Sequence, residues 1–340
     1  MYPYPNSSFH PIMAEKEAEF GKSQEENSFV HHRKSMPKLD WPSKPTSVSL
    51  FVQEFLQISQ NTINQMKSFL ESLQLTVNEG KYEGEDFIIL IGTDGFNLEV
   101  SMKFQDKETP PILSLTPLRQ GFISFLEFKE FSVHIPQVVR GNCWILPRYR
   151  LQVEYHTSKG VKTFCVLNDL AVNRDSSNGS LIINCSCNEF GFAQIIGDGL
   201  IVATPTGSTA YNKGAGGALV HPLLPVFLMT PICALSLSAR PIVFPQSATL
   251  TISLERPKSL KQGRALEGDA MNSQQFASVS FDGKHAPFSF GEKLVVSLSP
   301  YKFRSVMIKK SIADWPVRLA QLMGWNDRKH QKALPSQDTS

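Results

Sequence analysis

Residues 197–211 read GDGLIVATPTGSTAY, which predicts a strand, a turn and the start of a helix. Residues 200–203 form a short apolar, β-branched run typical of a buried strand. Residues 204–207, Thr-Pro-Thr-Gly, end it, because proline fixes φ and lacks an N–H while glycine tolerates positive φ. Ser208 or Thr209 is expected to cap the helix. Hydroxyls and free N–H groups at a helix start suit a polar or anionic ligand, and an ordinary capped turn explains the same residues equally well.

This string resembles the signature of the NAD kinase family, whose members phosphorylate the 2′-hydroxyl of the adenosine ribose of NAD to make NADP. The match continues through the glycines at 214–217 and through His221-Pro222. A match of this length is far more specific than a short glycine pattern. The resemblance extends from about residue 41 to about residue 332.

The resemblance implies a fold of two domains with the active site between them. The first is a doubly wound, Rossmann-like α/β N-terminal domain, and the second is a β-rich, layered C-terminal domain. It further implies NAD as the substrate and ATP, bound with Mg²⁺, as the phosphoryl donor. Family members assemble as dimers or tetramers, so a homo-oligomer is expected.

The composition fits a globular protein of two modest domains, with 340 residues, 41% of them hydrophobic and 19% charged. The net charge of +3 is too small to favour a nucleic-acid or membrane partner. Five cysteines, mostly in apolar runs, predict reduced core thiols, and Cys185 and Cys187 lack the further ligands of a zinc site. The first residues carry acidic side chains and no apolar targeting segment, so a cytoplasmic protein is expected.

The chain is expected to divide into five segments. In order these are a disordered polar tail (1–40), the α/β domain (41–148), the β-rich NAD-binding domain (149–300), a segment returning to the first domain (301–330) and a second tail (331–340). A strand at 47–52, a helix over 53–73 and a strand at 86–91 give the doubly wound opening.

Three further elements are predicted outside this opening. Residues 163–172 are expected to form one strand, and residues 258–272 a flexible insertion. Residues 314–326 predict an amphipathic C-terminal helix with Asp314 as its cap and Pro316 in its first turn.

An acidic residue follows the buried strand at 86–91, in the sequence Gly92-Thr93-Asp94-Gly95-Phe96. Open α/β sheets bind ligands at this edge, although an Asx turn would also explain the aspartate. The family motif here is G-G-D-G-T, and the resemblance assigns Asp94 to orienting, and possibly deprotonating, the ribose hydroxyl. It also assigns Gly92, Thr93 and Gly95 to the phosphate-donor loop, with Gly95 also contacting substrate.

Two of these five residues depart from the family motif. Thr93 replaces a glycine, which would cost roughly 1–3 kcal/mol of strain if that position requires positive φ. Phe96 replaces a threonine and removes a hydroxyl from the donor side.

The remaining site residues also follow from the resemblance. Phe122 belongs to a G-F-L-like motif and is expected to line the NAD pocket. Asn168 and Asp169 match an L-N-E motif that contacts the ribose and phosphates, with an aspartate shorter than glutamate by one methylene. The wall around adenine and ribose is expected to comprise Thr206, Thr209, Ala210, Tyr211 and Gly214.

Four residues are expected at the edges of this site. Asp198 is assigned to the nicotinamide carboxamide, because an acceptor suits an amide donor. Arg240, in an S-x-R-P-I-V-x-P-like segment, is expected either to bind substrate or to support the loop through a buried ion pair. Asp282 and Gly283 match the F-D-G motif and are expected to support the site.

Three functions remain open at this stage. The first is phosphorylation of NAD by ATP. The second is a non-catalytic NAD(P)-binding regulatory subunit, because Thr93, Phe96 and residues 117–120 depart from the family on the donor side. The third is a lipid kinase, which would share a G-G-D-G-T-like motif but not the TPTGSTAY run, and which would need an exposed amphipathic membrane element.

Overall fold

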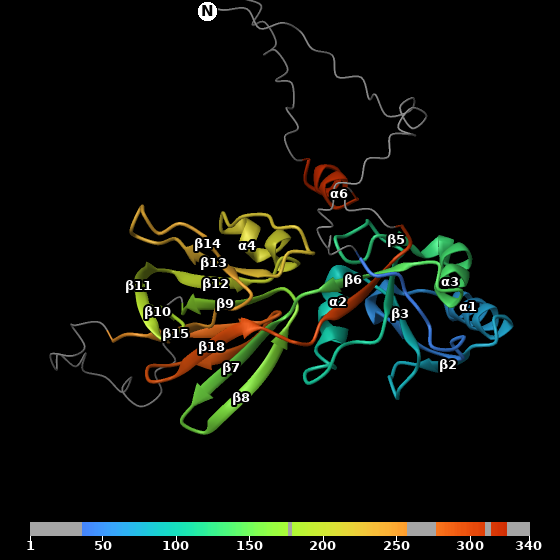
Figure 1. Ribbon diagram of the computed structural model, residues 1–340, viewed down its shortest axis with the longest axis horizontal. Coiled ribbons are helices and arrows are strands. Elements are labelled where there is room, and N and C mark those ends of the chain that lie inside the picture. The colour runs from blue at the N-terminus through green and yellow to red at the C-terminus, as the bar shows by residue number, and fades with distance from the viewer. Residues whose placement is uncertain (1–35, 176–178, 257–276, 310–313, 325–340) are drawn as a thin grey trace, which may run out of the picture. The chain divides into compact units, whose positions relative to one another are not determined.

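The computed structural model describes residues 36–175, 179–256, 277–309 and 314–324. Most of the expected N-terminal tail, the second tail and the expected insertion lie outside the described residues. The described chain comprises an α/β part built on one sheet and a β-rich part built on two sheets (Figure 1). The predicted fold class is therefore confirmed. Met36 and Leu39, inside the expected tail, are buried, and Lys38 pairs with Trp144.

The α/β part is organised around a seven-stranded sheet. Its strands are β1 (Ser47–Val52), β2 (Thr76–Glu79), β3 (Phe87–Ile91), β4 (Ile112–Thr116), β5 (Leu126–Glu127), β6 (Trp144–Arg148) and β19 (Phe303–Met307). The order is β2-β1-β3-β4-β19-β6, with β5 paired to β4, and every pairing is parallel except β19 with β6. Strands β3 and β4 are buried throughout, as central strands of a parallel sheet must be. Strand β19 returns the chain to this first sheet.

The helices of this part are η1 (Glu54–Leu56), α1 (Gln60–Ser72), α2 (Asp94–Ser101), η2 (Phe128–Glu130) and α3 (Phe131–Val139). Helix α1 begins seven residues later than the expected helix over 53–73. Gln57 has a φ of 48°, which interrupts the helix, and the Ser59 hydroxyl then caps α1 by accepting the N–H of Thr62 at 3.2 Å. Helix α3 and strand β6 were not predicted.

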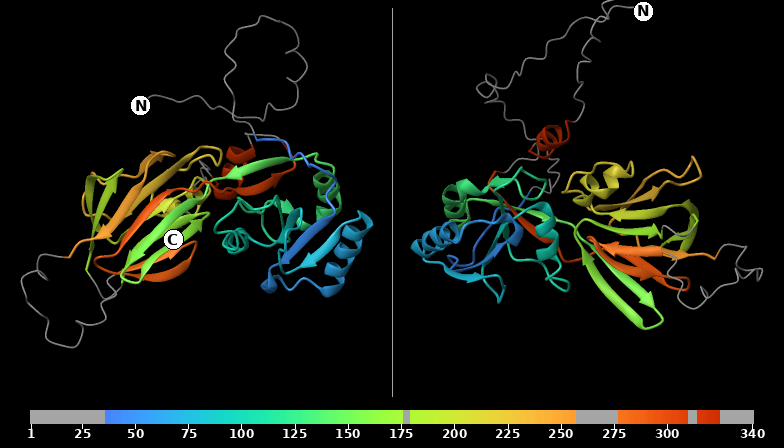
Figure 2. Two further views of the ribbon diagram at one scale, coloured as in Figure 1. Left: turned by 60° about the horizontal axis from the view of Figure 1, so that its bottom comes forward. Right: turned by 180° about the vertical axis from the view of Figure 1, so that it is seen from behind.

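The β-rich part contains two six-stranded antiparallel sheets. One is β11 (Phe190–Gly197), β10 (Leu181–Cys187), β15 (Leu250–Leu254), β18 (Lys293–Leu298), β7 (Leu151–Thr157) and β8 (Gly160–Val166) in that order. The other is β14 (Ile242–Pro245), β13 (Val226–Ile232), β12 (Gly199–Ala203), β9 (Asp169–Arg174), β16 (Ala277–Phe281) and β17 (Lys284–Phe288). Their facing sides bury one core that includes Val153, Val202 and Phe227 (Figure 2).

The strand expected over 163–172 is in fact two strands, β8 and β9. The break falls at residues 167 and 168, where the Asp282 carboxylate accepts the backbone N–H groups of Leu167 and Asn168, both at 2.7 Å. Those N–H groups therefore cannot make the hydrogen bonds to a neighbouring strand that one continuous strand would require.

The strand predicted at 200–203 is confirmed as the buried β12, but the predicted helix cap is wrong. A 3₁₀ turn, η3 (Gly207–Thr209), and a single helical turn, α4 (Tyr211–Gly214), follow it. The Ser208 hydroxyl donates to the carbonyl of Pro205 at 2.7 Å, and the Thr209 hydroxyl donates to that of Thr206 at 3.2 Å. Neither hydroxyl caps α4. The C-terminal helix α6 (Asp314–Met323) includes Asp314 as its first residue.

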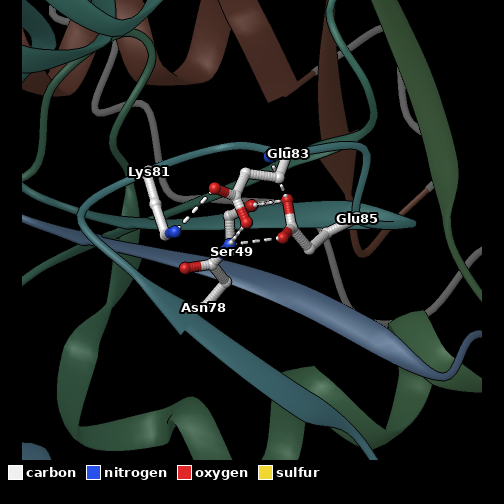
Figure 3. A network of polar contacts seen from close by, with 5 residues as sticks. All are labelled: Ser49, Asn78, Lys81, Glu83 and Glu85. Atoms are coloured by element: carbon white, nitrogen blue, oxygen red, sulfur yellow. Dashed lines mark hydrogen bonds and ion pairs between the residues drawn. The ribbon is translucent and has the colours of Figure 1, made fainter.

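A polar network fixes the connection between β2 and β3 (Figure 3). The Glu85 carboxylate accepts hydrogen bonds from Asn78 at 2.6 Å, from the Ser49 hydroxyl at 2.7 Å and from the Glu83 amide at 2.7 Å. Lys81 forms an ion pair with Glu83 at 2.6 Å. Burial alone would raise the pKa of Glu85, but these hydrogen bonds lower it to about 2.

All five cysteines are unpaired, and Cys143, Cys165 and Cys185 are buried, which confirms the prediction of thiols that lie mainly in the core. Within the described ranges, no helix combines the length and the hydropathy that crossing a bilayer requires.

Candidate functional site

Asp94 is the first residue of α2 and lies just beyond the end of β3. Its Oδ2 accepts the N–H of Phe122 at 2.7 Å, and its Oδ1 accepts those of Ile123 at 3.0 Å and Ser124 at 2.8 Å. Gly121 makes this approach feasible, because a Cβ there would lie 2.3 Å from Oδ1. Oδ1 has two donors, whereas Oδ2 has one and keeps room for a further donor such as a hydroxyl.

The donor loop beside Asp94 is unstrained. Thr93 has a φ of −89°, so the strain considered for a threonine at this position is absent. Its amide and hydroxyl both donate to Oε1 of Gln53, at 3.0 and 3.1 Å. Phe96 packs against Gly92, where an added Cβ would lie 2.6 Å from its ring. The substituted residues therefore fill the loop with internal contacts.

The turn after β12 and the segment before β9 form one tightly packed unit. The Thr204 hydroxyl donates to the carbonyl of Leu167 at 2.6 Å and accepts the N–H of Gly207 at 3.0 Å. A Cβ on Gly207 would lie 2.1 Å from the carbonyl oxygen of Asn168, so only glycine fits there. Asn168 Oδ1 is buried and has no hydrogen-bond partner in the described residues, which leaves an acceptor for a ligand donor.

Two carboxyl groups meet beneath this unit. Asp282 accepts the N–H groups of Leu167, Asn168 and Asp169, the last at 3.3 Å. Burial raises the pKa of Asp282 to about 6, even though the three amides and the charge of Arg150 favour its ionised form. Burial and then the charge of Asp282 raise the pKa of Asp169 to about 7. Both carboxyl groups therefore bind protons at a higher pH than ordinary aspartates, and Asp169 in its protonated form is able to donate a hydrogen bond as well as accept one.

Asp169 faces the side of its sheet that α4 covers (Figure 1). Strand alternation places Asp169, Ala171 and Asn173 on this same face. The hydroxyl of Tyr211 donates to Oδ1 of Asn173 at 3.1 Å. Burial and the nearby Asp169 carboxyl raise the pKa of Tyr211. The predicted residues Asn168, Asp169 and Tyr211 are therefore brought together.

Arg148 links this unit to the Asp94 loop, and the sequence analysis did not single it out. Its Nη2 donates to the carbonyl of Phe122 at 2.9 Å, and its Nη1 donates to the hydroxyl of Thr206 at 3.4 Å. Burial, with the charge of Arg318, lowers the pKa of Arg148 to about 10, and the Asp94 carboxylate opposes this change. The available signal was a pair of arginines, at 148 and 150, directly after an apolar run at the expected domain boundary.

Helix α6 lies against the loop that binds Asp94. Arg318 stacks on the ring of Phe125 at 3.6 Å, and Trp315 contacts the ring of His221 edge-on at 5.3 Å. Arg119, in the loop before Phe122, donates to the carbonyl of Leu322 at 3.4 Å. The C-terminal segment therefore supports the site region.

The other predicted residues lie at the margin of this cluster or outside it. Asp198 lies at the opposite end of β12 from Thr204, about 20 Å along the strand, and pairs with Arg174 at 2.7 Å. This is the end that Tyr211 reaches, because Gly199, next to Asp198, pairs with Asn173, which accepts the Tyr211 hydroxyl. Arg240 is exposed and makes no ion pair with any described residue, so the buried ion pair considered for it is wrong. The three remaining glycines, Gly95, Gly214 and Gly283, are exposed.

No three His, Cys, Asp or Glu side chains of the described ranges gather closely enough to hold a metal ion. The carboxylates of Asp94 and Asp282 instead accept hydrogen bonds from backbone amides.

The fold and the site define a class: an α/β domain followed by a β-sandwich domain, with motif loops from both parts joined by hydrogen bonds. Residues 167–307 match the family model described as "ATP-NAD kinase C-terminal domain". The crystal structure of yeast NADH kinase complexed with NADH has the same fold, with a TM-score of 0.74, 23% identity and coverage of 88% of this chain and 94% of that one. An NAD kinase from Archaeoglobus fulgidus in complex with ATP aligns with a TM-score of 0.60 and 21% identity, over 82% and 97% of the two chains.

Curated relatives carry the same family name. "NAD kinase 2, chloroplastic" of Arabidopsis thaliana is 34% identical over 275 residues, which is 78% of this chain and 26% of that protein. "NAD(+) kinase" of Saccharomyces cerevisiae is 30% identical over 266 residues, which is 73% of this chain and 47% of that protein. The chain thus spans a quarter to a half of the length of these relatives. Residues 167–307 thus match the C-terminal domain of the NAD kinase family, and about three quarters of the chain is similar in sequence to NAD kinases.

Proposed function

We propose that this protein transfers the γ-phosphoryl group of ATP to the 2′-hydroxyl of the adenosine ribose of NAD, giving NADP. The observation that carries the proposal is the hydrogen-bonded chain from Asp94 through Phe122 and Arg148 to Thr206. This chain places an aspartate with a free acceptor position beside the residues assigned to the adenosine wall.

In this proposal Asp94 accepts the hydrogen bond of the ribose hydroxyl and orients its oxygen for attack on the donor phosphate. Asn168 offers its unpartnered carbonyl oxygen, and Asp169 offers a carboxyl group, to the ribose and phosphate region. Thr206, Thr209, Ala210 and Tyr211 contact adenine and ribose, with Phe122 beside them. Asp198, at the far end of β12, receives the nicotinamide carboxamide.

Phosphoryl transfer requires mainly positioning and charge neutralisation. Mg²⁺ enters with ATP, bound to the donor phosphates, as part of the substrate. The protein's contribution is the arrangement of Asp94 and the donor loop around the reacting oxygens.

We further propose a cytoplasmic homo-oligomer. Apolar side chains are exposed on the edge strand β14 and on the segment before it, including Leu235, Leu237 and Val243, of which Leu237 is 90% exposed. Contiguous exposed apolar residues favour a second copy as the partner. Light scattering on the wild type and on Leu237→Glu tests this, and a monomeric wild type would contradict it.

The donor loop favours one alternative, a regulatory subunit that binds NAD(P) without catalysis. The Thr93 amide, which would otherwise be free to meet a phosphate, is bonded to Gln53, and Phe96 covers Gly92. In this alternative the dinucleotide site is kept and the donor site is closed, and the chain acts on an active relative in a hetero-oligomer.

The two functions are separated by measuring NADP formation from NAD, ATP and Mg²⁺ together with NAD binding by calorimetry. Turnover with binding supports the kinase, with no gain expected from Thr93→Gly/Phe96→Thr. Binding without turnover supports the alternative, particularly if the double variant restores turnover or if the chain changes the activity of a co-assembled relative. Absence of both contradicts the two proposals together.

A further inference from the structure

Arg148 is a buried cation that makes no direct ion pair with a described residue, although the Asp94 carboxylate is near enough to act on its charge. It ends β6, its side chain is 2% exposed, and its Nε donates to the hydroxyl of Ser305 at 2.8 Å. With the bonds to Phe122 and Thr206, all of its acceptors are uncharged oxygens. Among the described residues no carboxylate forms an ion pair with it. Burying a guanidinium without a direct ion pair is costly, so a contribution to stability alone does not account for this residue.

The acceptors of Arg148 show what this side chain holds together. Both backbone polar groups of Phe122 are bound: its N–H donates to Asp94, and its carbonyl oxygen accepts a hydrogen bond from Arg148. Thr206 belongs to the turn that packs on Asn168 through Gly207. One rigid guanidinium fork therefore spans the two loops that carry the site residues.

We propose that Arg148 is a positioning residue of the phosphoryl transfer. It holds the loop that binds Asp94 against the Thr206 turn, and so sets the distance between the hydroxyl acceptor and the adenosine wall. The reaction in this statement rests on the proposed function, whereas the positioning of the loop rests on the geometry alone.

The charge of Arg148 adds to this role. A positive group close to Asp94 also favours the negative charge that develops on the ribose oxygen and the transferred phosphoryl group. Helix α6 adds further charges here: Arg318 lies near Asp94, and Asp314 lies near Arg318. Of the two arginines, only Arg148 is hydrogen-bonded to both loops.

Arg150 offers a matched control two residues further on. Its side chain is also fully buried, with 0% exposed, and it also donates only to uncharged oxygens: the carbonyls of Tyr301 at 2.8 Å, Phe104 at 2.7 Å and Lys107 at 2.7 Å. It therefore fixes the segment after α2 and not the loop that binds Asp94. Substituting either arginine by methionine removes the same charge and the same kind of hydrogen bond.

The test compares Arg148→Met, Arg148→Lys and Arg150→Met in the full chain, at a temperature where unfolding curves show each to be folded. Hydrogen exchange by mass spectrometry follows the amides of residues 122–124 and 104–107. Steady-state kinetics give kcat and KM for NAD. In Arg148→Met we expect exchange at 122–124 to rise at least about tenfold and kcat to fall about 100-fold, with a smaller change in KM.

Arg148→Lys keeps the charge but not the fork, so it should recover part of kcat while exchange at 122–124 remains raised. Arg150→Met should raise exchange only at 104–107 and leave kcat within about threefold of wild type. If Arg148→Met does not fold, the test uses hydrogen exchange at 122–124 and kcat measured on Arg148→Lys instead.

Wild-type exchange at 122–124 in the Arg148 variants would overturn the inference. So would an Arg150→Met variant whose kcat falls as far as that of Arg148→Met. A wild-type protein that makes no NADP would refute the proposed function instead. In that case exchange at 122–124 still decides whether Arg148 positions the loop.

Discussion

Asp94, after β3 of the α/β part, and Asp282, after β16 of the β-rich part, bind neighbouring loops in the same way. Each carboxylate accepts the backbone N–H groups of three consecutive residues, 122–124 for Asp94 and 167–169 for Asp282. Each thereby fixes a turn: residues 122–124 lie outside the strands, and residues 167–169 lead into β9. The hydrogen-bond pattern alone does not distinguish them.

Their electrostatic surroundings differ. Asp94 has the guanidinium groups of Arg148 and Arg318 nearby. Asp282 has the charge of one arginine, Arg150, but it is desolvated and faces a second carboxyl group, Asp169. A carboxylate compensated by cations suits the binding of a reacting hydroxyl. A desolvated pair that retains protons suits the shaping of a turn. The neighbouring charges, more than the hydrogen bonds, indicate what each aspartate does.

The largest expected effect is on stability. Asp282→Ala leaves three N–H groups in a desolvated turn without their acceptor and should lower the free energy of unfolding by at least about 3 kcal/mol. Asp94→Ala should cost less, because Asp282 has the more desolvated surroundings, in which burial raises its pKa. Urea unfolding at pH 7 measures both. Equal losses would contradict the distinction between the two aspartates.

A substitution at Gly121 tests the Asp94 loop without changing Asp94 itself. In Gly121→Ala the new Cβ would lie 2.3 Å from Oδ1 of Asp94, so the carboxylate must move, at an expected cost of about 1–3 kcal/mol together with a lower kcat. The control Gly95→Ala lies in α2, where the new Cβ would meet the Thr93 hydroxyl at an ordinary contact distance of 3.7 Å. It should instead stabilise the fold by about 0.5–1 kcal/mol. If Gly121→Ala stabilised the fold as Gly95→Ala is expected to do, the close approach of Gly121 to Asp94 would be unimportant.

The pair Asp169 and Asp282 should make stability depend on pH. Both pKa values are raised on folding, to about 7 and about 6, so the folded state binds more protons than the unfolded state. The free energy of unfolding should therefore fall as pH rises from about 4 to about 7. Asp169→Asn should reduce that fall by something on the order of 1 kcal/mol, measured by urea titrations across this range.

Glu85 supplies the opposite control. Its folded pKa is lowered to about 2, so its contribution is complete above about pH 5 and is lost as pH falls toward 2. Glu85→Gln should change stability only on the acid side. If Asp169→Asn and Glu85→Gln changed the free energy of unfolding over the same pH range, the conclusion that folding raises the pKa values of Asp169 and Asp282 would be wrong.

The smallest effect is expected at Asp198. Its ion pair with Arg174 is partly exposed, so Asp198→Asn should change stability by less than about 1 kcal/mol. If Asp198 binds the nicotinamide carboxamide, the variant should lose affinity for NAD severalfold and keep its affinity for ADP-ribose. Calorimetry with both ligands measures this, and parallel losses would place Asp198 outside the nicotinamide site.

Much of the fold follows from local sequence. The buried strands β1, β3 and β12 were predicted because each is a short, nearly continuous apolar run bounded by polar or turn residues. The return of the chain to the first sheet came only from the family resemblance, because the pairing of β19 with β4 and β6 depends on contacts between residues far apart in sequence.

Details of the site were harder to predict, for physical reasons. The break between β8 and β9 depends on Asp282, more than 110 residues away, taking the amides that a ladder would use. Thr93 fits without strain because its φ is negative, which its residue type does not reveal. Arg148 could not be assigned, because a basic residue at a strand end is normally exposed, and its burial depends on three loops meeting there.

The central claim, that Asp94 is the working carboxylate, is tested most directly with Asp94→Asn. The asparagine keeps an oxygen acceptor and nearly the same shape, so NAD affinity by calorimetry should stay within about threefold of wild type. NADP formation from NAD, ATP and Mg²⁺ should fall by about 100-fold or more, the usual contribution of a positioned general base. An Asp94→Asn protein that binds NAD and forms NADP at the wild-type rate would contradict the account.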